Sequence, residues 1–154
     1  MGVHTRLTVE ALPPDAPAEV LWAGLLHDVG KAATTRMEGG KLVAHGHDRA
    51  GAALAEGILG RLDVAEETRA VVAWLVRHHL FHFSWNLEGS AELSPRQRRR
   101  VRDPRFPLLL ELLRADSLAS HGGGGGLKAY ERYRKVWEDE MSRVSGEDGS
   151  CRKR

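Results

Sequence analysis

The sequence has a single cysteine, Cys151, among its last four residues, so it cannot form an internal disulfide. Nothing in it therefore points to an oxidising compartment. It has no apolar run that approaches the length of a membrane-spanning helix. The first ten residues, MGVHTRLTVE, contain no apolar core of the kind found in secretion signals. These absences predict a cytoplasmic protein with no membrane association.

The composition is that of an ordinary globular domain. The 154 residues are 42% hydrophobic and 29% charged, and a chain of this length can bury a core. The net charge of +2 says little, but the segment 96–105 carries six arginines against one aspartate. A basic segment beside an active site would suit a phosphorylated or nucleic-acid substrate. The alternative is a solvent-facing helix surface, and the sequence favours neither interpretation.

Apolar residues recur at helical spacing along most of the chain, and strand-like alternation is scarce. We therefore expect an all-α bundle of about six or seven helices, forming one domain over residues 1–145. Asp15 is expected to cap the second helix, which Gly30 ends, and Asp63 with Glu66 to begin the fourth. Ser94 starts a later one. The expected helices cover 5–12, 15–29, 48–60, 63–80, a segment from 94, 107–120 and 127–144, with a loop or small hairpin turning at 39–40, a flexible glycine loop at 122–126 and a disordered polar tail at 146–154.

Several ionisable residues fall on the apolar faces of these helices, where a charge is unfavourable unless it is paired or metal-bound. His27 and Asp28 lie within the apolar second helix, and Asp116 closes a stripe of leucines. One such histidine is more often a hydrogen-bonded core residue than a ligand. That explanation weakens when four helices each direct such a group inward, and imidazole with carboxylate suits a divalent metal. The same placement recurs at His47, His78, His79 and His82.

The order of these residues resembles the HD superfamily of metal-dependent phosphohydrolases. The motifs are GVHT at 2–5, LLHDVGK at 25–31 and LLRADSLA at 112–119. The segments AHGHDRAGAALAEGILGRL at 44–62 and WLVRHHLFHF at 74–83 narrow the resemblance to the C-terminal HD domain of bacterial CCA-adding enzymes (tRNA nucleotidyltransferases). The likeness covers residues 2–121 and implies an HD-type helical bundle.

The resemblance implies a metal site holding one or two divalent ions, with Mn, Ni, Co, Fe, Zn and Mg all open. Asp28 could bridge to the second ion. If only one ion binds, His47 and His78 would contact the phosphate instead. The implied ligands are His4, His27, Asp28 and Asp116 for the first ion, and His47 with either His78 or His79 for the second.

The resemblance also implies which residues act on the substrate. Asp28 is expected to be catalytic through the metals, because two ions can activate a water and clamp the phosphate together. Lys31 lies one turn after His27 and could hold a phosphate oxygen, although the helix dipole also favours a lysine there. The expected substrate contacts are Lys31, His45, His82, Arg96 and Arg99.

The implied reaction is hydrolysis of 2′,3′-cyclic phosphates and 2′-phosphates at the ends of RNA or nucleotides. The resemblance extends to HD modules fused to polynucleotide kinases that heal RNA ends, so a separate RNA-repair or tRNA-processing partner is one option. Only three residues precede His4, so we do not expect this chain alone to add CCA. Two alternatives remain, a 5′-nucleotidase-type HD phosphatase and a non-catalytic RNA-binding HD module. The sequence indicates no oligomeric state.

Overall fold

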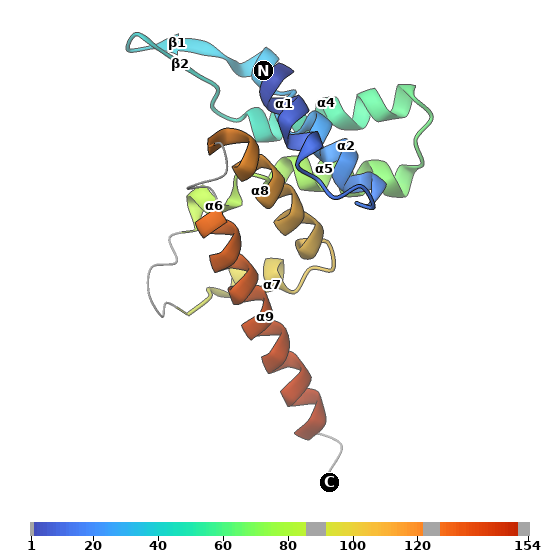
Figure 1. Cartoon of the computed structure of the whole chain (residues 1–154), viewed down its shortest axis with the longest axis vertical. Helices are drawn as coiled ribbons and strands as arrows, with labels where there is room; N and C mark the ends of the chain where they lie inside the picture. The colour runs from blue at the N-terminus through green and yellow to red at the C-terminus, as the bar shows by residue number, and fades with distance from the viewer. Residues whose placement is uncertain (1, 86–91, 122–126, 151–154) are drawn as a thin grey trace.

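The structure is a computed structural model that describes residues 2–85, 92–121 and 127–150. The expected glycine loop at 122–126 and the last four residues of the expected tail lie outside the described residues. Within them the fold is helical except for one small hairpin, which confirms the all-α prediction (Figure 1). The elements are α1 (Gly2–Glu10), α2 (Ala18–Leu26), α3 (Lys31–Thr34), β1 (Arg36–Glu38), β2 (Lys41–Val43), α4 (His47–Arg61), α5 (Glu66–His78), α6 (Phe81–Ser84), α7 (Pro95–Val101), α8 (Phe106–His121) and α9 (Leu127–Ser150).

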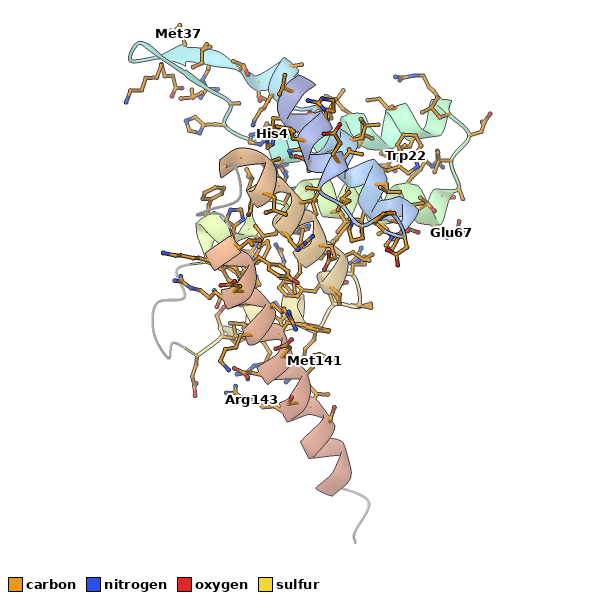
Figure 2. The ribbon with its side chains drawn as sticks, in the orientation of Figure 1. His4, Trp22, Met37, Glu67, Met141 and Arg143 are labelled. Carbon is orange, nitrogen blue, oxygen red and sulfur yellow. The ribbon has the colours of Figure 1, made fainter. Side chains whose placement is uncertain are left out.

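Seven of these described helices have seven residues or more, as expected, and the two single-turn helices α3 and α6 were not anticipated. The hairpin turns at Gly39 and Gly40, which both have positive φ, and pairs Met37 with Leu42. Met37 projects away from the body of the molecule (Figure 2). The last helix runs to Ser150, beyond the end expected near residue 144.

Helix starts were predicted with mixed success. Ser94 caps α7 as expected, because its hydroxyl accepts from the Gln97 amide while the Gln97 side chain accepts from the Ser94 amide. The caps expected at Asp15 and Asp63 are wrong. α2 follows Pro17 and α5 follows Ala65, and neither has a side-chain cap. Asp63 instead takes φ 55° in the turn between α4 and α5, a conformation that aspartate tolerates better than most residues.

The α2 helix lies at the centre of the upper part of the bundle, in contact with α1, α5 and α8 (Figure 1). α4 and α5 pack along each other as a helical hairpin, and α9 contacts α8 and α7 before it extends away from the body. The sequence folds this way because each helix buries one apolar stripe. The fully buried apolar residues include Val20, Ala23, Leu59, Val72, Leu75, Val76, Phe106, Leu109 and Leu112. None of the helices that the structure describes has both the length and the apolar character of a membrane span.

Candidate metal centre

The histidine–aspartate pair of the LLHDVGK motif lies where α2 ends and not inside it. The α2 helix stops at Leu26, three residues earlier than expected, and His27 to Gly30 form a turn that leads into α3. The His27 amide still donates to the Ala23 carbonyl at 2.7 Å, so the backbone of His27 continues the last turn of α2. The turn lets the two side chains face different neighbours. His27 meets α1 and α8, while one oxygen of Asp28 faces α4 and α5.

Three side chains from three elements form the first cluster. The His4 Nε2 atom, from α1, lies 3.1 Å from the His27 Nε2 atom and 3.0 Å from the Asp116 Oδ1 atom on α8. His27 Nε2 lies 3.8 Å from the same oxygen. His4 is on the part of α1 that packs against α8 (Figure 2). His27 is buried and the other two are partly exposed, so the cluster is open on one side.

The second cluster joins Asp28 to the start of α4 and the end of α5. The Asp28 Oδ1 atom lies 3.4 Å from His47 Nε2 and 3.9 Å from His79 Nε2, and all three residues are buried. Its other oxygen, Oδ2, lies 3.6 Å from His27 Nε2 and 3.8 Å from His4 Nε2. Asp28 therefore faces both clusters, one oxygen to each.

The donor set fits a divalent metal, which the family resemblance implies. His27, His47 and His79 each place Nδ1 at 2.7–2.9 Å from a backbone carbonyl, of Gly24, Ala44 and Val76 respectively. A carbonyl only accepts, so each Nδ1 carries the proton and each Nε2 presents a lone pair to the cluster. The Nε2 atoms of His47 and His79 are buried and have no hydrogen-bond partner among the described residues. Buried lone pairs that converge on carboxylates without a donor are what a metal ion would satisfy.

The ionisation of the second cluster follows from its burial. Burial raises the pKa of the Asp28 carboxyl, but the hydrogen bond from Lys31 and the positive charge of that lysine outweigh it, so the pKa lies below its ordinary value. Burial lowers the pKa of His79 to about 4, although the hydrogen bond to the Val76 carbonyl opposes the shift. At neutral pH the cluster therefore holds an ionised carboxylate and a neutral imidazole, the forms that bind metal.

Lys31 and His45 line a pocket next to the second cluster. The Lys31 Nζ atom lies 2.6 Å from Asp28 Oδ2, and the lysine side chain is 34% exposed. The pocket has a volume of about 550 Å³ and is also lined by His47 and Leu80. The His45 side chain is 68% exposed and lies 3.5 Å from Glu38. Both residues therefore line the pocket beside the second cluster, and the contacts with substrate expected of them stay a prediction.

Of the three histidines near the end of α5, only His79 reaches the metal clusters. His78 lies against Trp74, with ring centroids 4.6 Å apart, and its Nδ1 donates to the Trp74 carbonyl. Burial lowers the pKa of His78, and the positive charges of nearby arginines add to the shift. Burial also lowers the pKa of His82, while the negative charge of Asp116 opposes this shift. His82 is therefore close enough to the first cluster to feel the charge of Asp116.

The basic segment splits into residues with different surroundings. Arg96 lines a second pocket with His78, whereas Arg99 is exposed and lines none of the pockets described here.

Sequence reasoning missed two features of the site. The carbonyls that orient the imidazoles belong to the backbone of Gly24, Ala44 and Val76, which carries no side-chain signal. The sequence also did not single out Arg100, which is half-buried, from the neighbouring arginines of the segment 96–105.

The low pKa of His79 predicts how stability depends on pH in the metal-free protein. The unfolded chain takes up this proton near pH 6.5, the folded chain only near pH 4, so the unfolded state binds more protons in between. Stability should therefore fall as pH drops from about 6.5 to 4, by up to about 3 kcal/mol from His79. Urea unfolding of metal-free protein at several pH values measures this. His45→Gln, at an exposed histidine, should keep the slope, whereas His79→Gln should flatten it; equal slopes in all three proteins would contradict the assignment.

Comparison with known proteins agrees with this geometry. The family model for the HD domain matches residues 2–120. Among curated proteins, the A-adding tRNA nucleotidyltransferase of Deinococcus radiodurans is 37% identical over 123 residues, which cover 79% of this chain and 26% of the relative. The CC-adding tRNA nucleotidyltransferase of Thermus thermophilus is 34% identical over 143 residues, covering 88% of this chain and 31% of the relative. No solved structure gave a significant match.

The chain spans between a quarter and a third of the length of these relatives. The resemblance inferred from the motifs is confirmed, because the matched region includes His4, the His27–Asp28 pair and Asp116. Since the family model covers most of the chain, this protein belongs to the HD domain family, whose members are of the metal-dependent phosphohydrolase type.

Proposed function

We propose that this protein is a metal-dependent phosphohydrolase that acts on 2′,3′-cyclic phosphates and/or 2′-phosphates at the ends of RNA or nucleotides. The observation that carries the proposal is Asp28, whose two oxygens face two separate sets of histidines. Such an arrangement suits a pair of divalent ions with one shared carboxylate. The ligands would be His4, His27 and Asp116 on one side and His47 and His79 on the other.

The chemistry divides between the metal and the side chains around it. When bound, the ions would lower the pKa of a water and neutralise charge on the phosphate. Asp28 is buried and accepts a hydrogen bond from Lys31, so its two oxygens stay directed toward the two sets of histidines. The ammonium of Lys31 faces the pocket and can lie against a phosphate oxygen that enters there. We assign His45 to the rim of the pocket and His82 to the side facing Asp116.

An RNA end is the substrate that the surroundings favour. Both relatives are named for acting on tRNA. The described part of the basic segment also contributes Arg96 to a pocket that shares Leu80 with the metal-side pocket. We further propose that the HD domain extends through α9 to about residue 145, because α9 packs on α8 and α7. A cytoplasmic protein working beside a separate RNA-repair or tRNA-processing enzyme would fit this role.

A metal-dependent hydrolysis assay tests the proposal. The protein is stripped of metal and reloaded separately with Mn, Ni, Co or Mg, then given 2′,3′-cyclic AMP, 2′-AMP, 3′-AMP and 5′-AMP. We expect turnover of the cyclic and 2′ substrates only after metal is restored. Turnover confined to 5′-AMP would move the assignment to a nucleotidase. A folded, metal-loaded protein that turns over none of the four would indicate an RNA-binding module.

A further inference from the structure

A second pocket lies beside the metal centre, on the other side of the residues that end α5. It has a volume of about 280 Å³ and is lined by Asp48, Arg77, His78, Leu80, Phe81, Ser84, Arg96 and Arg100. These residues come from α4, α5, α6 and α7 and the turn after α5, so the pocket is assembled only when the helices pack. We call it the arginine pocket.

Its positive charge is only partly balanced by the residues that the structure describes. Arg77 pairs with Asp48, which leaves Arg96 and Arg100. Among the described residues neither of these has a hydrogen bond or an ion pair. Other arginines of the same segment are neutralised: Arg98 and Arg102 contact the buried Glu140, and Arg105 contacts Asp103. Among the described residues that line the arginine pocket, Arg96 and Arg100 are therefore the arginines without an ion pair.

Arg100 is held in this position at a cost. Its side chain is partly buried, and burial followed by the positive charges of Arg96 and Arg77 lowers its pKa. Bringing like charges together at a partly buried site is unfavourable unless an anion offsets them. A guanidinium pair is well suited to a phosphate, since the planar donors match its oxygens. The arrangement is that of an anion site.

The arginine pocket is a neighbour of the pocket at the mouth of the metal centre. Leu80 lines both this pocket and the one that holds Lys31, His45 and His47. In α4 and at the end of α5, neighbouring residues divide between the two sides. His47 joins the second metal cluster while Asp48 lines the arginine pocket, and His79 joins the cluster while His78 lines the pocket. One extended substrate could therefore contact both places.

We propose that the arginine pocket binds a backbone phosphate of an RNA chain whose terminal phosphate lies at the metal centre. The inference rests on the proposed function for the position of the RNA end. It explains how the enzyme would distinguish a polynucleotide from a mononucleotide, because a mononucleotide has no second phosphate to place there. A nucleotide's own terminal phosphate is the other source of the same chemistry, and the experiment separates the two.

The test compares two double variants that remove the same charge. Arg96→Gln/Arg100→Gln empties the pocket of free arginines. Arg61→Gln/Lys135→Gln removes two positive charges at exposed sites that line none of the pockets described here, and the exposed pair of Lys135 with Asp139 contributes little stability. Binding of a short single-stranded RNA ending in a 3′-phosphate, which supplies a terminal phosphate and is not among the proposed substrates, is measured by fluorescence anisotropy on metal-loaded protein over a range of salt. Binding of 2′-AMP and hydrolysis of 2′,3′-cyclic AMP are measured in parallel.

We expect the pocket variant to weaken RNA binding at least about tenfold and to reduce the salt slope by about 0.7, the value for one lost single-strand phosphate contact. The control variant should change RNA affinity less than about twofold. The affinity of the pocket variant for 2′-AMP should stay close to that of the parent protein. Equal loss in both variants, no loss, or an equal loss for 2′-AMP would overturn the proposal. Arg96→Gln alone, at an exposed position, repeats the test if the double variant folds poorly. The cyclic AMP assay reports on the metal centre alone, so a failure of the proposed function is scored separately.

Discussion

Asp28→Asn is expected to abolish metal-dependent phosphohydrolysis while the protein remains folded. The amide keeps the size of the side chain, but it removes the negative charge that faces both histidine clusters. Its amide nitrogen can also donate a hydrogen bond to the Nε2 lone pair of His47 or His79, which is then no longer free to bind a metal. Loss of an outer partner of a metal ligand already costs about 10–100-fold. Loss of a carboxylate shared by two sites should therefore cost more than about a thousandfold in kcat/KM.

The measurement combines activity with metal stoichiometry. Asp28→Asn should lose bound metal as determined by elemental analysis of dialysed protein, and should keep the helical circular dichroism signal. Asp63→Asn is the matched control. It makes the same chemical change at an exposed residue with φ 55°, where asparagine is equally well tolerated. Full activity and full metal content in Asp28→Asn would remove the basis for the shared-carboxylate site.

The sequence could not decide which histidine of the Arg77-His78-His79 run faces the candidate metal centre. Consecutive residues on a helix point about 100° apart, and both histidines followed an apolar stripe. The structure separates them by tertiary packing. Trp74 holds the ring of His78 and supplies its carbonyl, whereas His79 at the end of the helix turns toward Asp28. Helical periodicity predicts which face of a helix a residue occupies. The direction of each histidine side chain is decided by the end of α5 and by the contact with Trp74.

The cap predictions show the same limit at the level of single residues. Ser94 was identified because its motif is local, with both partners three residues apart. Aspartate is also a preferred capping residue, but neither Asp15 nor Asp63 caps a helix. The chain enters α2 through Pro17, and it enters α5 through the tight turn after α4. The bundle itself was predictable because burial of apolar stripes involves many residues, whereas each cap depends on one.

Gly30→Ala is expected to be the most disruptive glycine-to-alanine change among the described glycines. Gly30 was predicted to end the second helix, but that helix stops at Leu26, and the φ of Gly30 is −65°, which any residue adopts. Its role is close approach. A Cβ at this position would overlap the carbonyl oxygen of His47 and come within 2.6 Å of the amide nitrogen of Gly51. Both are backbone atoms of α4, so no side chain can move aside to relieve the contact.

The overlap links stability to the metal centre. To admit the methyl group, the start of α4 must move away from the turn that carries His27 and Asp28, and it takes His47 with it. We expect a loss of about 3 kcal/mol or more, at the upper end for overpacked sites, and a melting temperature lower by about 6–12 °C. Metal affinity of the folded protein should fall as well, because the Asp28–His47 geometry opens.

Gly57→Ala is the control that isolates close approach from the loss of a glycine. Gly57 lies on the exposed side of the same helix, and a Cβ there meets nothing within 4 Å. An alanine in a helix interior is favoured over glycine by about 0.5–1 kcal/mol, so this variant should be slightly more stable than the parent. Thermal unfolding and metal titration of the two variants side by side make the comparison. If Gly30→Ala matched the parent in both measurements, the backbone contact between the His-Asp turn and α4 would not be what positions His47 against Asp28.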